Sequence, residues 1–165
     1  MPGPDRRSNP SGIRPAREDE AGELSDLALR SKAMWGYSPE FVEACRASLT
    51  VTVEDIRGTL VYVHDGGRID GFYGLAGSPP RATLEYLFVE PESTRRGIGT
   101  RLLLHAAATA CRLGFTEIEV ESDPNAEEFY LRNGGVRIGD AESDVEPGRT
   151  LPLLLIDIGQ AGVGG

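Results

Sequence analysis

The sequence lacks the features of exported and membrane-bound proteins. No stretch approaches the roughly 20 consecutive apolar residues that a membrane-spanning helix needs. Residues 1–12 (MPGPDRRSNPSG) contain no apolar segment of the kind that a secretory signal requires. Cysteine is scarce, and both Cys45 and Cys111 fall within apolar helical patterns, which favours buried free thiols over a disulfide. We therefore expect a protein of the reducing cytoplasm that has no membrane partner.

Positive charge is also in short supply. The chain has 17 Lys and Arg residues against 26 Asp and Glu residues, which gives a formal net charge of −9. Nucleic acids bind basic surfaces, so we do not expect a nucleic-acid partner. The acidic balance suits a cationic acceptor such as an amine, or it serves only to keep the surface solvated. Lys32 is the single lysine, and Arg, Gly, Ala and Pro are plentiful, a bias that indicates a GC-rich bacterial genome.

The residues that are present fit one folded domain. A chain of 165 residues is long enough for one core and short for two. Residues 1–12 and 159–165 are rich in types that bury little surface, so we interpret both segments as flexible tails. A single domain is then expected over residues 13–158.

Hydrophobic periodicity predicts alternating strands and helices within that domain. Strands are expected at Ile13–Ala16, Thr59–Val63, Ile69–Leu75, Ala82–Val89, Thr116–Ser122, Val136–Gly139 and Leu151–Ile158, and helices at Glu18–Lys32, from Pro39 onward, at Gly97–Leu113 and at Pro124–Asn133. Ser38 and Asp123 are helix-capping residue types, and each precedes a proline. The Asp-Gly-Gly sequence at residues 65–67 predicts a hairpin turn. This order predicts an α+β fold, layered as in α/β proteins, with a mixed sheet.

The turn between the strand ending at Val89 and the long helix has a distinctive composition. Arg95 and Arg96 precede a Gly-Ile-Gly sequence at residues 97–99. A helix N-terminus has unpaired N–H groups and a partial positive charge, and glycine lets a ligand lie against the backbone, so the turn suits a pyrophosphate. It has neither the Gly-Lys-Ser/Thr of a Walker loop nor the third glycine of a dinucleotide fingerprint. On this segment alone, the alternative that these residues only shape the turn stays open.

A second segment, after the next predicted strand, adds specificity. LFVEPESTRRGIGTRLL (residues 87–103) and DPNAEEFYLRNGG (residues 123–135) together resemble the GNAT superfamily of acetyl-CoA-dependent N-acetyltransferases. In that family an Arg/Gln-x-x-Gly-x-Gly/Ala turn binds the CoA pyrophosphate, and an Asn-x-x-Ala-x-x-Phe-Tyr segment supplies a CoA contact and the general acid. The chain departs from this pattern at Thr94, the first turn position, and at Gly135, where the family usually has phenylalanine.

The resemblance covers Ile13 to Ile158 and implies a GNAT-like fold, with a mixed, mostly antiparallel central sheet flanked by helices on both faces. It also implies acetyl-CoA as the acetyl donor. The implied cofactor-binding residues are Leu87, Phe88, Val89, Arg95, Arg96, Gly97, Ile98, Gly99, Thr100, Asn125 and Tyr130. Tyr130 is the implied general acid, because a phenol within hydrogen-bond reach can protonate the departing thiolate.

The implied reaction is direct attack of a primary amine, expected to belong to a small molecule, on the thioester in a ternary complex. The amine must first lose a proton, which a carboxylate can accept. Glu85 is the first candidate for this base, because strand alternation would place it on one face with Leu87 and Val89. Glu119 and Glu121 are the alternatives.

Acceptor binding is predicted for three residues outside the two motifs. Trp35 and Tyr37 would form walls of the acceptor pocket, and Arg149 would bind a carboxylate of a small amine substrate. No metal is expected, since His64 and His105 have no carboxylate or cysteine at ligand spacing.

Several alternatives remain at this point. The acceptor could be a small amine, a peptide N-terminus, a lysine or an aminoglycoside. The resemblance allows a homodimer. A non-catalytic acyl-CoA-binding or sensory module on the same fold is the main rival function, and an unrelated nucleotide-phosphate-binding protein is the second.

Overall fold

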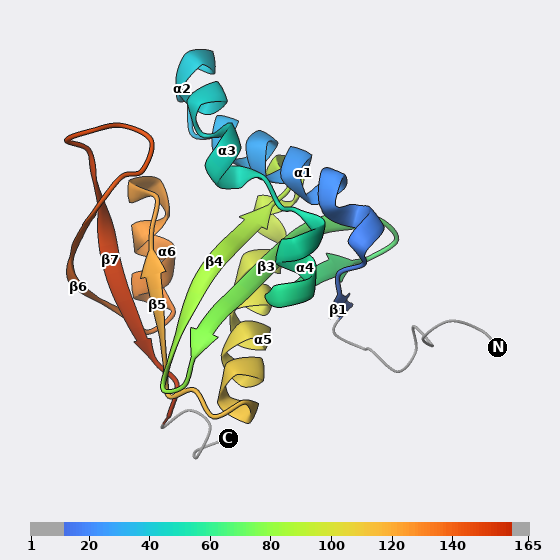
Figure 1. Cartoon of the computed structure of the whole chain (residues 1–165), viewed down its shortest axis with the longest axis vertical. Coiled ribbons are helices and arrows are strands. Elements are labelled where there is room, and N and C mark those ends of the chain that lie inside the picture. The colour runs from blue at the N-terminus through green and yellow to red at the C-terminus, as the bar shows by residue number, and fades with distance from the viewer. Residues whose placement is uncertain (1–11, 160–165) are drawn as a thin grey trace.

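The structure, a computed structural model, describes residues 12–159 (Figure 1). The predicted flexible tails, residues 1–12 and 159–165, lie outside the described residues except for Gly12 and Gly159. The carbonyl of Gly12 accepts a hydrogen bond from the Asp65 N–H at 2.7 Å, and the Gly159 N–H donates to the Thr116 carbonyl at 3.1 Å. Both of these residues are therefore hydrogen-bonded to the folded domain.

The strands of the described residues form one mixed sheet in the order β1-β2-β3-β4-β5-β7-β6. They are β1 (Ile13–Pro15), β2 (Leu60–Asp65), β3 (Ile69–Ser78), β4 (Arg81–Val89), β5 (Glu117–Glu121), β6 (Gly135–Glu142) and β7 (Thr150–Asp157). Neighbouring strands are antiparallel except β4 and β5, which are parallel. The expected mixed, mostly antiparallel sheet is confirmed.

Helices connect these strands in the predicted places, with two additions. The α-helices are α1 (Ala21–Ala33), α2 (Pro39–Ala44), α3 (Arg46–Leu49), α4 (Val53–Gly58), α5 (Ile98–Arg112) and α6 (Glu127–Arg132), and the 3₁₀ turns are η2 (Glu18–Glu20), η3 (Pro91–Arg96) and η4 (Pro124–Ala126). Ser38 caps α2 as predicted, since its hydroxyl accepts from the Phe41 N–H at 3.1 Å. The sequence analysis missed α3 and α4, although Thr52 and Asp55 form a reciprocal capping box that begins α4.

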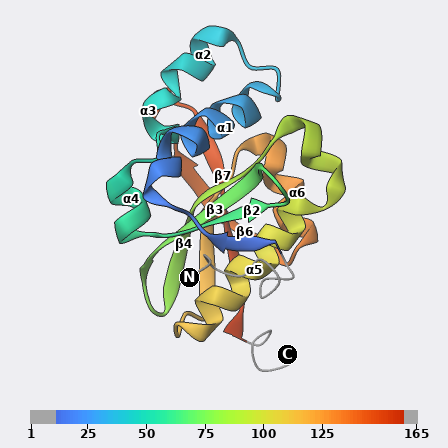
Figure 2. The same ribbon diagram turned by 90° about the vertical axis from the view of Figure 1, so that its right-hand side faces the viewer.

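Helices cover both faces of the sheet, as Figure 2 shows for α1 and α4 on one side and α5 and α6 on the other. Each face has its own apolar cluster. Leu24, Leu27 and Phe72 are fully buried between α1 and the sheet. Leu102 of α5 and Ile118 of β5 are fully buried on the opposite face. Burying each such side chain stabilises the fold by roughly 1.5–3 kcal/mol, so the two layers hold the sheet between them.

The β4–β5 pair is the feature that creates space for a site. Their parallel register covers only Arg81–Thr83 against Glu117–Glu119. Beyond these residues the two strands part, and Figure 1 shows the widening gap between them. Over the rest of its length β4 pairs, within the described residues, with β3 alone.

A bulge in β4 lies at the point where the strands part. Leu84 is opposite Leu75 and Tyr86 is opposite Gly74, so Glu85 has no partner in β3. Leu84 and Leu87 consequently pack on the same apolar cluster, although residues three positions apart in a regular strand point to opposite faces. The expectation that Glu85 shares a face with Leu87 and Val89 by simple alternation is therefore wrong, because the bulge interrupts the alternation at Glu85 itself.

The structure also explains the departure at Gly135. An ideal Cβ at Gly135 would lie 2.9 Å from the carbonyl oxygen of Tyr130, closer than real Cβ atoms approach backbone. A phenylalanine could not occupy this position without moving α6 or β6. Glycine at this position therefore allows the chain after α6 to pack closely against the Tyr130 carbonyl.

Candidate active site

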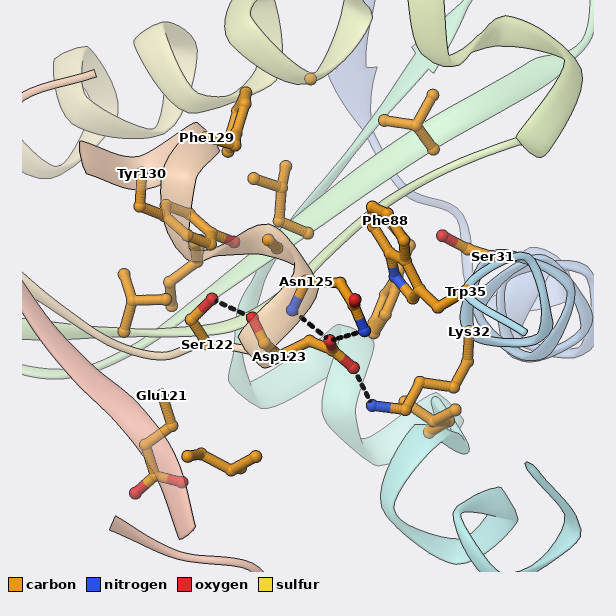
Figure 3. Close-up of a pocket in the computed structure, with 18 of the residues that line it drawn as sticks. Ser31, Lys32, Trp35, Phe88, Glu121, Ser122, Asp123, Asn125, Phe129 and Tyr130 are labelled. Atoms are coloured by element: carbon orange, nitrogen blue, oxygen red, sulfur yellow. Dashed lines mark hydrogen bonds and ion pairs between the residues drawn. The ribbon is translucent and has the colours of Figure 1, made fainter. Parts of the chain in front are cut away.

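A cavity of about 720 Å³ opens where β4 and β5 part, and Figure 3 looks into it. Its walls come from α1, β4, the turn before α5, the end of β5, α6 and the loop between β6 and β7. Of the predicted site residues, the lining set contains Trp35, Glu85, Leu87, Phe88, Val89, Gly97, Gly99, Thr100, Asn125, Tyr130 and Arg149. The structure thus brings together residues that are far apart in the sequence. The volume falls in the range of small-molecule sites.

The turn before α5 presents backbone rather than side chains. Gly97 has φ +75°, a left-handed conformation that favours glycine, and it begins the 15-residue helix α5. The first N–H groups of the helix have no intrahelical acceptor and carry the positive end of its dipole. Gly97, Gly99 and Thr100 line the cavity, whereas the side chain of Ile98 is buried in the core. Ile98 can therefore contribute only its backbone.

Among the described side chains, no arginine of the turn lines the cavity. Arg96 is exposed and is not among the lining residues. The side chain of Arg95 lies outside the part of the chain that the structure describes. Thr94, which replaces the first motif residue, lines the cavity, and its hydroxyl donates to the Pro91 carbonyl at 3.1 Å.

The parted half of β4 offers an unused strand edge. Leu87, Phe88 and Val89 are paired with β3 on one side, while their other side faces the opening. Such an edge presents alternate N–H and C=O groups that an extended ligand can bind as an added strand does. The side chain of Phe88 packs against Phe72 with ring centroids 5.8 Å apart, and Figure 3 shows it beside Trp35.

Tyr130 is placed by α6 so that its hydroxyl points into the cavity (Figure 3). The residue is only 6% exposed. No hydrogen bond joins this hydroxyl to another described residue, and since no buried side-chain oxygen of the described residues lacks a partner, the hydroxyl oxygen is accessible from the cavity. Burial raises the pKa of Tyr130, so the phenol keeps its proton at neutral pH. A protonated, unpartnered hydroxyl in a cavity is equipped to donate to a ligand.

An ion pair that the sequence did not predict joins α1 to the segment that follows β5. Lys32 Nζ lies 2.5 Å from Asp123 Oδ2, and both side chains are 13% exposed. Asn125 donates its N–H and its side-chain amide to Asp123 at 2.8 and 2.9 Å. Burial alone would raise the pKa of Asp123, but the bonds from Lys32 and Asn125 outweigh it and leave that pKa lowered. Counted back from Ala126, the family's Asn position also falls on Asp123, so the assignment of that position to Asn125 is corrected.

Tyr37 extends this polar cluster instead of lining the cavity. Its hydroxyl donates to Asp123 at 3.0 Å, and it accepts from Asn125 at 3.0 Å and from Arg149 at 2.9 Å. The Arg149 guanidinium also lies over the rings of Phe41 and Tyr37, at 4.7 and 5.3 Å from their centroids. Tyr37 therefore fixes Arg149, which itself lines the cavity.

The three candidate bases differ in their ion-pair partners and in whether they line the cavity. Glu119 is bound to Arg81 at 3.1 Å and is not among the lining residues. Glu85 and Glu121 line the cavity, and neither forms an ion pair with another described residue. Burial, and then the charge of Asp55, raises the pKa of Glu85. Burial also raises the pKa of Glu121, with further contributions from the neighbouring carboxylates.

The histidines have structural partners. His64 Nδ1 lies 2.7 Å from Asp70 Oδ1, and His105 Nδ1 lies 2.8 Å from the Tyr73 hydroxyl. Within residues 12–159, no group of three or more His, Cys, Asp and Glu side chains is arranged to hold a metal ion. No helix in the same range is long and apolar enough to cross a bilayer. Cys45 and Cys111 are free thiols as predicted, but only Cys45 is buried, whereas Cys111 is partly exposed.

Comparisons with known proteins agree with this geometry. Residues 55–134, which include the turn before α5 and Tyr130, match the family model described as an acetyltransferase (GNAT) domain. No curated protein matches the sequence.

Solved structures share the fold at low sequence identity. A GCN5-related N-acetyltransferase from Rhodopseudomonas palustris is 22% identical, with 88% of this chain and 94% of that chain covered and a TM-score of 0.76. PaiA N-acetyltransferase from Thermoplasma acidophilum, solved with coenzyme A, is 22% identical, with coverage of 88% and 97% and a TM-score of 0.73. An aminoglycoside 6'-N-acetyltransferase complexed with coenzyme A is 17% identical, with coverage of 88% and 96% and a TM-score of 0.64. The family match over residues 55–134 and the shared fold agree with the motifs and the cavity, so the chain has the fold of GNAT acetyltransferases and is similar to their family model over that region.

Proposed function

We propose that the protein transfers the acetyl group of acetyl-CoA to a primary amine of a small molecule, by direct attack in a ternary complex. The observation that carries this proposal is the unpartnered hydroxyl of Tyr130, which shares one cavity with the open edge of β4 and the N-terminus of α5. This set combines a proton donor, a strand-like binding edge and an anion-binding turn.

The chemistry of the residues at the cavity suits acetyl-CoA. The N–H groups from Gly97 to Thr100 would bind the pyrophosphate, with Arg96 and Arg95 adding positive charge nearby. The backbone from Leu87 to Val89 would pair with the pantetheine arm. The side-chain N–H groups of Asn125 bind Asp123 and Tyr37, so its amide oxygen remains to accept a hydrogen bond from the donor. When bound, acetyl-CoA supplies an activated thioester carbonyl.

The chain's own groups can manage the protons of the transfer. Glu85, acting directly or through a water molecule, would take a proton from the ammonium form of the acceptor, and its raised pKa makes it a better base. Backbone N–H groups near Val89 would stabilise charge that develops on the carbonyl oxygen. As the new C–N bond forms, the C–S bond breaks with its electron pair on sulfur. Tyr130 would then protonate the departing thiolate.

We further propose that Trp35 and Arg149 contact the acceptor, with Tyr37 holding Arg149 in place. Arg149 keeps guanidinium N–H groups beyond the one that binds Tyr37, and these could bind an acceptor carboxylate. An Arg149→Ala variant should then raise the KM for such an acceptor. An unchanged KM for every accepted amine would remove Arg149 from the acceptor site.

The direct test is release of the CoA thiol from acetyl-CoA in the presence of a library of primary amines. The proposal predicts amine-dependent release, with the N-acetylated product identified by mass spectrometry. Stabilisation by acetyl-CoA without release of thiol for any amine would instead support a non-catalytic acyl-CoA-binding module. Equal stabilisation by ATP or NAD, without an effect of CoA compounds, would contradict both.

A further inference from the structure

A row of carboxylates leads along β5 to the mouth of the cavity. Glu117, Glu119 and Glu121 alternate along the strand and therefore project from one face. Arg81 of β4 forms ion pairs with Glu117 at 2.5 Å and with Glu119 at 3.1 Å. Glu121 lies beyond the last β4–β5 residue pair, where the strands have parted. The single arginine thus neutralises the paired half of the row and leaves Glu121 without a cation among the described residues.

Four further carboxylates line the same cavity: Glu85, Asp123, Glu128 and Asp144. Glu85 lies two residues beyond Thr83 on β4, as Glu121 lies two residues beyond Glu119 on β5, and Thr83 and Glu119 are register partners. Glu85 and Glu121 are thus placed across the opening from each other. Asp144 comes from the loop between β6 and β7 and also lines the cavity. After burial, the charges of Asp144, Glu119 and Glu85 raise the pKa of Glu121 further.

The cations of the cavity wall are Lys32, Arg132 and Arg149, and among the described residues none of them forms an ion pair with Glu85, Glu121 or Asp144. Lys32 is paired with Asp123. Arg149 donates to Tyr37 and lies over two aromatic rings, and it forms no ion pair with another described residue. Glu85, Glu121 and Asp144 thus form no ion pair with any described cationic side chain, and grouped like charges destabilise a protein unless a cation binds there.

Tyr130 gives an independent sign that a ligand occupies this cavity. Its side chain is more than nine-tenths buried, and its hydroxyl points into the space without a protein partner (Figure 3). Such a hydroxyl is free to hydrogen-bond a molecule that enters the cavity. The carboxylates indicate the charge of the molecule that binds beside it.

We infer that the acceptor carries at least two ammonium groups: one is acetylated, and Glu121 and Asp144 bind another. This inference rests on the proposed function and names the substrate class of the same site. Glu85 serves the reacting amine, while Glu121 lies on the opposite strand across the opening.

Three acceptors with the same four-carbon chain test the inference: 1,4-diaminobutane, butylamine and 4-aminobutanoate. They differ only in the charge of the group at the far end. The diamine should exceed butylamine in kcat/KM by about tenfold, after correction for its two equivalent amines. Added salt should reduce this preference, since the carboxylates are solvent-accessible. Equal values for the diamine and butylamine would overturn the inference, and preference for 4-aminobutanoate would overturn it in favour of a carboxylate bound by Arg149.

Variants locate the second ammonium site. Glu121→Gln and Asp144→Asn should each lower the ratio of kcat/KM for the diamine to that for butylamine. Glu142→Gln is the matched control, because Glu142 is exposed on β6 and does not line the cavity. A ratio that falls equally in all three variants would show that net charge, and not this site, determines the preference. Kanamycin, a rigid polycation, is run alongside the linear diamine, and the better acceptor identifies the source of the ammonium groups.

Calorimetry separates this inference from the proposed function. With CoA present, 1,4-diaminobutane should bind more tightly than butylamine, and Glu121→Gln should remove the difference. Preferential binding of the diamine without acetylation would uphold the cation site and reject the acetyltransferase function. Acetylation of both amines at equal rates, with equal binding, would uphold the function and reject the cation site.

Discussion

The two halves of the β4–β5 pair differ in whether their backbone and charged groups have partners within the described residues. In the paired half, backbone groups are joined by the parallel register, Ile118 is fully buried, and Arg81 neutralises two carboxylates. In the parted half, the edge of β4 is open, the Tyr130 hydroxyl has no described partner, and Glu85 and Glu121 have no cation among the described residues. The same two strands thus provide stability at one end and binding groups at the other. Substitutions in the two halves should accordingly affect different properties.

The largest effect on stability should come from the paired half. Ile118→Ala removes a fully buried side chain and leaves a cavity, so we expect the free energy of unfolding to fall by about 2–5 kcal/mol. Because Ile118 does not line the active-site cavity, kcat should change little at a temperature where the variant stays folded. Chemical denaturation and the thiol-release assay measure the two quantities. A large loss of kcat without loss of stability would reverse the assigned roles.

The parted half should give the opposite result. Tyr130→Phe removes the proposed proton donor, and general-acid catalysis is typically worth at least about a hundredfold, so kcat should fall by that factor. The KM for acetyl-CoA and the free energy of unfolding should be nearly unchanged, since the hydroxyl has no protein partner to lose. Tyr62→Phe, at a partly buried tyrosine outside the cavity, is the control. Equal kcat in Tyr130→Phe and the wild type would remove Tyr130 from the mechanism.

A smaller effect on stability is expected at Asp123, which, unlike Glu85 and Glu121, has an ion-pair partner among the described residues. The pKa of Asp123 is lowered in the fold, so its stabilising contribution is present at neutral pH and is lost as the pH falls through that lowered value. Asp123→Asn should therefore cost about 1–2 kcal/mol at pH 7, a value reduced for partial exposure, and the cost should disappear in acid. Urea denaturation between neutral and acidic pH checks this. A cost that persists in acid would mean that charge is not responsible.

The smallest effect is expected at Glu121, with the opposite sign. Its pKa is raised by burial and then by nearby carboxylates, so its charged form destabilises the fold at neutral pH, and this penalty disappears as the pH falls through the raised value. Glu121→Gln should raise the free energy of unfolding at pH 7 by less than about 1 kcal/mol, because the group is solvent-accessible. Denaturation at pH 7 beside the Glu142→Gln control measures it. A clear loss of stability would indicate that Glu121 has a stabilising partner.

Local patterns in the sequence predicted most of the fold. Strand alternation, helical periodicity and the caps at Ser38 and Asp123 act between near neighbours, and each is confirmed in the structure. The Gly97 turn was also predictable, since glycine in a left-handed conformation is a local requirement. Short α3 and α4 were missed because their few residues show no clear period, although the Thr52–Asp55 capping box was available as a signal.

The rest of the site depends on contacts that no local pattern contains. The bulge at Glu85 follows from how β4 and β3 pair, so alternation along β4 gave the wrong face. The ion pair between Lys32 and Asp123 joins residues 91 positions apart. Tyr37 was predicted to form a wall of the acceptor pocket, but only the fold shows that it binds Arg149 instead of lining the cavity.

Amide hydrogen exchange with and without acetyl-CoA tests the central claim within one strand. At short labelling times, acetyl-CoA should slow exchange of the cavity-facing amides in Leu87–Val89 and of the amides from Ile98 to Thr100, where the open edge and the helix N-terminus would bind it. The amides of Ala82 and Thr83, which lie in the paired half of β4, should exchange at the same rate in both conditions. No slowing in the parted half, or equal slowing along all of β4, would contradict the account.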